Sequence, residues 1–157
     1  MKIASKEYVI KRMSSLMINP KKKYSQNFLI DYDVVKRSVD NLSLSIDDIV
    51  VEIGPGLGAL TQEILDRGNQ VYAYEIDEDM YRSLKEEMKQ YPNLHLENVD
   101  FLKVDLSFLK NKSVKVISNV PYNLTTPIIE KIVTSDIDIK VFEFMVQKEV
   151  YDRIKAK

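Results

Sequence analysis

The sequence predicts a doubly wound α/β domain, in which helices cover both faces of a mostly parallel sheet. Apolar segments of strand length alternate with amphipathic segments of helix length from residue 31 onward, and this alternation is typical of parallel sheets. Several of the strand-like segments end in glycine or polar residues, and open α/β sheets bind their ligands at those ends. At 157 residues, the chain is long enough for one domain with a sizeable core.

The individual elements follow from the periodicity of the apolar residues and from the residues that start and stop each segment. Gly68-Asn69 marks the end of the second helix, Asp77 caps the third, and Pro92-Asn93 separates the third helix from the next strand. In chain order, we expect a helix over 31–41, a strand over 49–53, a helix over about 57–67, a strand over 71–75, a helix over about 78–89, strands over 94–99 and 114–118, a helix over about 126–134 and a strand over 141–146. Residues 154–157 fall inside what looks like a further helix, so we expect the domain to be truncated after its fifth strand.

The composition excludes several classes of protein and site. With 45% apolar and 30% charged residues, the chain is typical of a soluble globular protein. No apolar run approaches the roughly 20 residues of a membrane span. The absence of Cys fits the reducing cytoplasm. His95 is the only His, so neither a His-based metal cluster nor a Ser-His-Asp triad is available. We therefore expect a cytoplasmic protein that has no metal site and does not enter a membrane.

The net charge of −1 hides an asymmetry between a basic N-terminal arm, residues 1–24, and an acidic body, residues 25–157. The arm contains seven Lys or Arg residues and a single acidic residue, so it carries +6 and the body carries −7. A basic arm on an acidic body favours a polyanionic partner that is contacted at one place. Within the arm, Lys21, Lys22 and Lys23 form an uninterrupted basic run. The alternative interpretation is a solvated, frayed terminus.

The first strand runs into a glycine-rich turn, Glu52-Ile53-Gly54-Pro55-Gly56-Leu57-Gly58. Glycines at alternate positions let the backbone approach a ligand where side chains would collide. Read from Gly54, the turn also satisfies the G-x-G-x-x-A form of the dinucleotide fingerprint, with Ala59 last. The turn therefore predicts a site for a nucleotide cofactor, and a tight strand-to-helix turn that holds no ligand is the alternative.

Two carboxylates follow the next two strands. Glu75 lies 21 residues after Gly54, and a carboxylate there can accept hydrogen bonds from both ribose hydroxyls while disfavouring a 2′-phosphate. Asp100 follows the third strand and can accept a hydrogen bond from an adenine amine, while a neighbouring apolar side chain such as Phe101 covers the ring. An Asp after a strand is also a common turn residue. Taken together, the glycine turn and the two acids predict an adenosine-shaped slot.

The fourth strand ends in Ser118-Asn119-Val120-Pro121-Tyr122. Val120 precedes a proline and is therefore pushed toward an extended conformation, and Pro121 stiffens the turn. The side-chain oxygen of Asn119 and the carbonyl of Val120 suit the two N–H bonds of an exocyclic amine, and Tyr122 offers a face on which the base can stack. Two such acceptors would localise the nitrogen lone pair toward an electrophile. A Pro-Tyr turn that only stabilises the fold is the alternative.

Four motifs, in this order, resemble those of the S-adenosylmethionine-dependent ribosomal RNA adenine dimethyltransferases. They are SQNFLID at 25–31, Glu-x-Gly-x-Gly-x-Gly at 52–58, Asn-x-Pro-Tyr at 119–122 and MVQKEVYDRI at 145–154. The resemblance covers nearly the whole chain and implies a Rossmann-like sheet of the class I methyltransferase type. It also implies S-adenosylmethionine as the cofactor, and the transfer of two methyl groups to each of two adjacent adenosines near the 3′ end of small-subunit ribosomal RNA.

Carried over by position, the resemblance assigns residues to three roles. The catalytic turn is Asn119, Pro121 and Tyr122, and the implied RNA contacts are Lys21, Lys22 and Lys23. For the cofactor, the resemblance implies that Asn27 and Leu29 border it, that Gly54 approaches its methionine part, that Glu75 takes the ribose, that Asp100 holds the adenine amine and that Asn119 lies at the reacting region. The implied partner is small-subunit ribosomal RNA or a pre-ribosomal particle, and we expect a monomer.

The sequence also departs from the small-subunit pattern. It has Ser25 where these enzymes usually have Gly, and Val120 where Leu is common; YSQNFL resembles the sister family, the antibiotic-resistance methylases of large-subunit ribosomal RNA. GPGLGALTQ and MVQKEV favour the small-subunit target. An NAD-dependent oxidoreductase and a non-catalytic RNA-binding module are more distant alternatives. Because family members carry further strands and a small C-terminal helical domain, we expect this chain to bind cofactor without methylating RNA.

Overall fold

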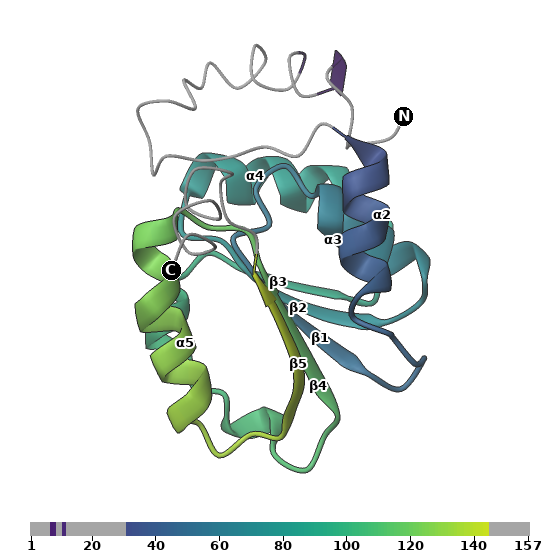
Figure 1. Cartoon of the computed structure of the whole chain (residues 1–157). Coiled ribbons are helices and arrows are strands. Elements are labelled where there is room, and N and C mark those ends of the chain that lie inside the picture. The colour runs from purple at the N-terminus through teal and green to yellow at the C-terminus, as the bar shows by residue number, and fades with distance from the viewer. Residues whose placement is uncertain (1–6, 9–10, 12–30, 145–157) are drawn as a thin grey trace, which may run out of the picture.

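A five-stranded parallel sheet forms the centre of the computed structural model, which describes residues 7–8, 11 and 31–144 (Figure 1). The strand order is β3-β2-β1-β4-β5, and every neighbouring pair is parallel. The strands are β1 (Ile49–Ile53), β2 (Gln70–Tyr74), β3 (Leu94–Glu97), β4 (Val114–Ser118) and β5 (Ile139–Phe144). This order confirms the predicted doubly wound sheet.

Helices cover both faces of the sheet, as expected (Figure 1). One face packs against α2 (Tyr32–Asp40), α3 (Ala59–Asp66) and α4 (Glu78–Glu87), and the other against α5 (Thr125–Thr134). Short 3-10 turns complete the described part: η1 (Phe101–Lys103), η2 (Ser107–Leu109) and η3 (Tyr122–Leu124). Of the helices in the described ranges, none has the length and apolar character that a bilayer crossing requires.

The core consists of two apolar clusters, one on each face of the sheet. Because side chains alternate along a strand, Val50 belongs to the cluster under α2, α3 and α4, whereas Val51 belongs to the cluster under α5. The central strands are therefore largely apolar on both faces, which explains why β1 is apolar at every position except Glu52.

Local signals set most of the element boundaries. The Asp77 side chain accepts hydrogen bonds from the backbone N–H groups of Asp79 and Met80 and so caps α4, as predicted. Gly68 follows α3 with a φ of +92°, a conformation that glycine adopts without strain.

Several predicted boundaries were wrong by one to two residues. The helix expected from residue 57 begins at Ala59, because Gly58, its N-cap, has a left-handed φ of +96°. The second strand ends at Tyr74, so Glu75 lies just beyond it, and the third ends at Glu97. The fifth strand begins at Ile139, earlier than predicted, and the predicted residues 145 and 146 lie outside the described part.

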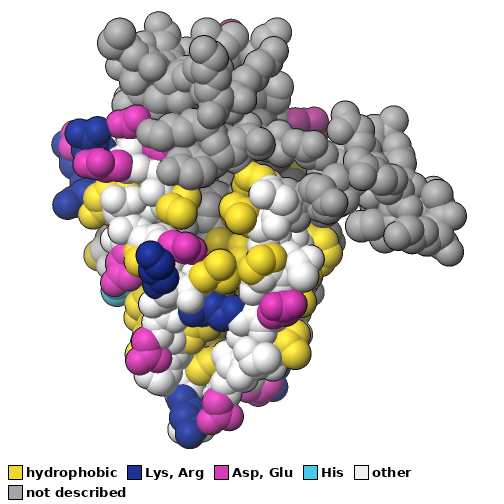
Figure 2. Space-filling view, turned by 90° about the vertical axis from the view of Figure 1, so that its left-hand side faces the viewer, with side chains coloured by type: hydrophobic (Ala, Val, Ile, Leu, Met, Phe, Trp, Pro, Cys, Tyr) yellow, Lys and Arg dark blue, Asp and Glu magenta, His cyan; other side chains and the backbone are white. Residues whose placement is uncertain are grey.

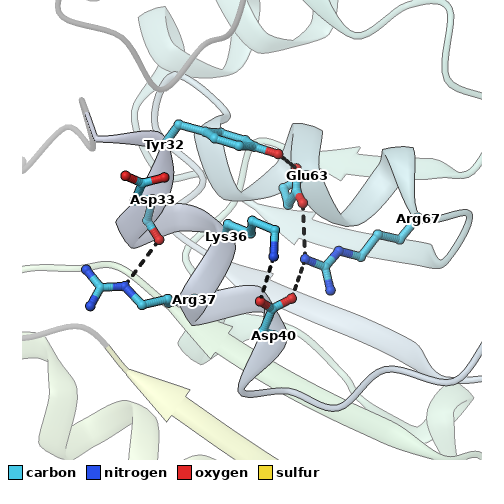
Figure 3. Close-up of polar contacts among 7 residues, drawn as sticks. All are labelled: Tyr32, Asp33, Lys36, Arg37, Asp40, Glu63 and Arg67. Carbon is cyan, nitrogen blue, oxygen red and sulfur yellow. Dashed lines mark hydrogen bonds and ion pairs between the residues drawn. The ribbon is translucent and has the colours of Figure 1, made fainter.

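A polar network joins α2 to α3 (Figure 3). The hydroxyl of Tyr32 donates a hydrogen bond to Glu63 Oε2 at 3.1 Å. Nη2 of Arg67 bridges Asp40 Oδ1 at 2.7 Å and Glu63 Oε1 at 3.1 Å, and Lys36 pairs with the other oxygen of Asp40. The network joins α2 to α3, the helix that begins where the glycine turn ends.

A buried ion pair lies at the opposite end of the sheet from the strand ends that bear the motifs. Lys115 Nζ is 2.8 Å from Asp48 Oδ2 and donates a second hydrogen bond to the backbone oxygen of Ser43. Burial opposes ionisation of Asp48, but hydrogen bonds from Lys115, Ser113 and Ser45 outweigh it and lower the pKa of Asp48 to about 2. The pair fixes the start of β4 against the loop before β1.

Candidate active site

The strand order places a switch point between β1 and β4, because the chain crosses to β2 and β3 on one side and continues to β5 on the other. Ligands of open α/β sheets bind at the carboxyl ends of the strands beside such a point. In this protein, these ends carry the glycine turn after β1, Glu75 after β2, Asp100 after β3 and Asn119 after β4. The fold therefore brings four predicted positions to one edge of the sheet.

The glycine turn adopts left-handed backbone at all three glycines: φ is +74° at Gly54, +60° at Gly56 and +96° at Gly58. At Gly54, an added Cβ would lie 2.8 Å from Cγ1 of Val120 and 3.1 Å from the backbone oxygen of Asn119. The glycine thus permits direct contact between the turn after β1 and the turn after β4.

Glu75 is held against the glycine turn. Its side chain is 3% exposed; Oε1 accepts a hydrogen bond from the backbone N–H of Gly56 at 2.9 Å, and Oε2 accepts one from Asp77 at 3.0 Å. Burial raises the pKa of Glu75, although the N–H groups of Asp77 and Gly56 oppose the shift. The carboxylate therefore sits between the glycine turn and the N-terminus of α4, with further lone pairs available to a ligand.

A small apolar pocket opens beside these groups. Its lining includes Gly54, Ile76, Asp100, Leu102 and Val120. Ile76 and Leu102 are 45% and 41% exposed and both line this pocket, so they offer apolar surface that suits a flat apolar ligand group. Figure 2 looks from the α5 side of the molecule, where hydrophobic side chains lie in a hollow flanked by charged ones.

Asp100 lines this pocket, and its Oδ1 accepts a hydrogen bond from the backbone N–H of Leu102 at 3.0 Å, which caps η1. The residue therefore has the turn role that is common for Asp, and it also faces the predicted adenine position. Phe101 contributes to the pocket lining but is only 4% exposed, and its ring packs against Tyr74. The apolar side chains that remain open at the pocket are those of Ile76 and Leu102.

The turn after β4 packs closely on β1. The backbone N–H of Asn119 donates to the oxygen of Ile53 at 3.2 Å, so the parallel ladder continues one step past Ser118. The oxygen of Pro121 accepts a hydrogen bond from Leu124 at 2.9 Å, which starts η3 and leads into α5. Val120 thus lines the cleft, and Asn119 and Pro121 flank it in the chain, whereas the side chain of Tyr122 is outside the described part.

Other predicted site residues lie outside the described residues altogether. These are Asn27 and Leu29 at the cofactor and Lys21, Lys22 and Lys23 in the basic arm, together with the motif segments 25–30 and 145–154. The division into an arm over 1–24 and a domain over 25–157 thus stays a prediction. Within the described ranges, no three His, Asp or Glu side chains are grouped as metal ligands would be.

Sequence reasoning missed the state of Glu52. This side chain is 1% exposed and its Oε1 accepts a hydrogen bond from the hydroxyl of Thr61. Oε2 is buried and has no hydrogen-bond partner within the described ranges. Burial raises the pKa of Glu52 to about 7; the bond from Thr61 opposes the shift, and the charge of Glu75 adds to it. The signal in the sequence was an acidic residue inside an otherwise apolar strand.

These features define the class of protein. A doubly wound parallel sheet carries a glycine turn after β1, an acid after β2 and an apolar cleft that is closed by the turn after β4. The protein is a Rossmann-like domain of the class I methyltransferase type.

The particular family follows from comparison with known proteins. Residues 17–157 match the model of the family described as ribosomal RNA adenine dimethylase, and the chain belongs to that family. A relative from Clostridium botulinum, named ribosomal RNA small subunit methyltransferase A, is 44% identical over 138 residues, which are 87% of this chain and 50% of the relative. The relative of the same name from Lactococcus lactis is 43% identical over 144 residues, which are 88% of this chain and 49% of the relative.

Solved structures agree with this assignment. The 23S rRNA methyltransferase ErmE has a TM-score of 0.71 and 32% identity, over 79% of this chain and 49% of its own. A dimethyladenosine transferase from Plasmodium falciparum has a TM-score of 0.63 and 25% identity; the match covers 81% of this chain and 46% of that protein. The chain spans about half the length of the curated relatives it matches. Family membership makes S-adenosylmethionine the cofactor.

Proposed function

We propose that this chain carries the cofactor-binding and catalytic residues of an enzyme that dimethylates two adjacent adenosines near the 3′ end of small-subunit ribosomal RNA during ribosome biogenesis. The observation that carries the proposal is the contact between the two turns: Gly54 lies directly under Asn119 and Val120, beside a pocket that Asp100 also lines. A methyl donor held by the first turn thereby meets an amine held by the second.

The described residues fit S-adenosylmethionine. Glu75 is fixed by two backbone N–H groups and retains lone pairs for the ribose hydroxyls. Ile76 and Leu102 offer exposed apolar surface for the adenine ring, with Asp100 as an acceptor for its amine. At Gly54, the absence of a side chain lets the first turn lie against Asn119 and Val120 of the second, and we assign the methionine part of the cofactor to this first turn.

S-Adenosylmethionine supplies the methyl group as an electrophile on a sulfonium. The amine of adenine is a poor nucleophile because its lone pair is delocalised into the ring. The side-chain oxygen of Asn119 and the carbonyl of Val120 would accept the two N–H bonds of the amine and localise that lone pair, and Tyr122 would stack on the base. This role consists of positioning and electrostatics, without a strong base.

The target base must first leave the RNA stack, at a cost of a few kcal/mol. Contacts to the phosphates compensate for such costs, and Lys21, Lys22 and Lys23 are the basic run proposed to supply them. The proposed partner is therefore small-subunit RNA or a pre-ribosomal particle.

The test is to incubate the protein and labelled S-adenosylmethionine with small-subunit particles from cells lacking this methylation, and to map the dimethyladenosines. We expect two adjacent modified adenosines near the 3′ end when the enzyme includes the full length of the relatives. Large-subunit RNA is the second substrate to test, because ErmE is 32% identical and YSQNFL resembles its family. Methylation of only large-subunit RNA would overturn the small-subunit assignment; cofactor binding without methylation of either RNA by such an enzyme would overturn both.

A further inference from the structure

Lys131 of α5 makes three contacts with the segment that follows β3. Its Nζ donates hydrogen bonds to the backbone oxygens of Leu102 at 3.1 Å and Val104 at 2.5 Å. The same ammonium lies 5.3 Å from the centroid of the Phe101 ring, within the range of a cation–π interaction. A single side chain thus holds both ends of η1 to the helix that covers this face of the sheet.

The η1 turn needs such support. It has three residues, and so short a 3-10 turn has little intrinsic stability. Its internal bonds are those from Lys103 to Asp100 and from Val104 to Phe101, plus the cap in which Leu102 donates to the Asp100 side chain. The oxygens of Leu102 and Val104 lie at the end of the turn, where backbone acceptors lack helical partners. Lys131 supplies those partners.

The position of η1 matters because it forms a wall of the cofactor pocket. Asp100, Phe101 and Leu102 all line that pocket. We propose that Lys131 is a positioning residue, which holds η1 in place so that Asp100 and Leu102 present the acceptor and the apolar surface that select adenine. The inference rests on the proposed function, since it deepens the assignment of the same pocket.

Three variants test the role. Lys131→Met removes the charge and the donors but keeps an unbranched side chain, and Lys131→Arg retains donors for both oxygens. Lys112→Met is the matched control, because it makes the same change at an exposed position outside this pocket. For each variant, calorimetry measures the affinity for S-adenosylhomocysteine and for its inosine analogue, in which a carbonyl replaces the adenine amine. Thermal unfolding and amide exchange of Lys103 and Val104 accompany the titrations.

We expect Lys131→Met to weaken S-adenosylhomocysteine binding about five- to tenfold, which is less than the loss of a direct charge-assisted hydrogen bond to the ligand, because Lys131 acts only through η1. Binding of the inosine analogue should weaken less, so the preference for adenine falls, and exchange of the Val104 amide should accelerate because η1 opens more often. Lys131→Arg should restore most of the preference, and Lys112→Met should leave it unchanged.

An unchanged adenine preference in Lys131→Met would overturn the proposal. The proposal is also wrong if the affinities for both ligands fall equally and in step with the unfolding temperature, because that pattern reports a merely structural role. Failure of the unsubstituted protein to bind S-adenosylhomocysteine is a different result: it overturns the cofactor site itself, and this inference with it.

Discussion

Gly54 and Val120 come from strands that are adjacent in the sheet but 66 positions apart in the sequence, and a Cβ on Gly54 would lie 2.8 Å from Cγ1 of Val120. Real Cβ atoms do not approach other atoms so closely. The turn after β1 and the turn after β4, which are proposed to bind the cofactor and to hold the target amine, therefore touch at a position where no side chain larger than a hydrogen fits, and this explains why glycine stands there.

We expect Gly54→Ala to weaken S-adenosylhomocysteine binding and to destabilise the fold by about 1–3 kcal/mol, because it combines a steric clash with a left-handed backbone. Gly68→Ala is the control, since its φ of +92° is equally unfavourable, but the added Cβ would meet only Cδ1 of Ile46 at 3.1 Å, away from the cleft. The control should lose stability and keep its cofactor affinity, as measured by denaturant unfolding and calorimetry. Equal affinity losses in both variants would contradict the contact's role.

Glu75→Ala should weaken S-adenosylmethionine binding by roughly 1.5–3 kcal/mol, the scale of charge-assisted hydrogen bonds. The substitution also removes the acceptor of the Gly56 and Asp77 N–H groups, so the glycine turn itself loosens. Glu97→Ala, at an exposed position on β3, serves as the control and should bind normally. Unchanged affinity in Glu75→Ala would remove this residue from the site.

Asn119→Ala should lower the methylation rate roughly ten- to thousandfold, comparable to the loss of one preorganised polar partner. Some loss of cofactor affinity is compatible with the assignment, because Asn119 lies at both sites. The comparison is Asn123→Ala, an exposed Asn in the same connection, measured with labelled cofactor and RNA in an enzyme that contains this chain. A near-normal methylation rate for Asn119→Ala would show that Asn119 does not hold the target amine.

Glu52→Gln should remove a pH dependence of stability. Burial raises the pKa of Glu52 from 4.5 to about 7, so this group's contribution is fully present below pH 4.5 and is lost as the pH rises through 7. A neutral Gln should therefore match the unsubstituted protein near pH 5 and exceed it at pH 8, by about 1–3 kcal/mol. Urea unfolding at the two pH values measures the free energy of unfolding of both proteins. If Glu52→Gln differs from the unsubstituted protein by the same amount at both pH values, the assigned pKa is wrong.

Replacing Lys21, Lys22 and Lys23 by Ala should weaken RNA binding and flatten its salt dependence, by up to about 0.7–0.9 in log–log slope for each lost phosphate contact. The charge-matched control replaces Lys110, Lys112 and Lys140, which surround a polar hollow at the far end of β4 and β5. Only the first variant should change the slope in filter-binding titrations at several salt concentrations. Identical slopes would mean that the arm is a solvated terminus.

The sequence was sufficient to predict the order of the strands and helices and the residues at the strand ends. Alternating apolar residues, the Asp77 cap and the Gly68 stop are local signals. In the structure, Asp77 caps α4 and Gly68 follows the end of α3, as these signals predict. The strand ends meet because a parallel sheet brings all its carboxyl ends to one edge. For that reason it was predictable that Gly54, Glu75, Asp100 and Asn119 would lie at one edge of the sheet.

The features that the sequence did not predict depend on contacts between segments that are distant in the chain. The η1 turn has no periodic pattern, and it is bonded to Lys131, which lies 29 positions away from Leu102. Phe101 was expected to cover the adenine ring, but it packs into the core, and the open apolar side chains belong to Ile76 and Leu102. The raised pKa of Glu52 likewise depends on its full burial in the folded protein; an acidic residue in an apolar strand signals that something is unusual there, but not that the side chain is buried.

The buried Lys115–Asp48 pair anchors the amino-terminal end of β4, whereas the turn beyond Ser118 carries the residues proposed as catalytic. Three steps of extended strand separate Lys115 from Ser118, a distance of about 10 Å. Substitutions this far apart that share no partner usually have additive effects. An engineer can therefore tighten the anchor, or alter the cleft for another methyl acceptor, and combine the best variants of each without re-optimising the other.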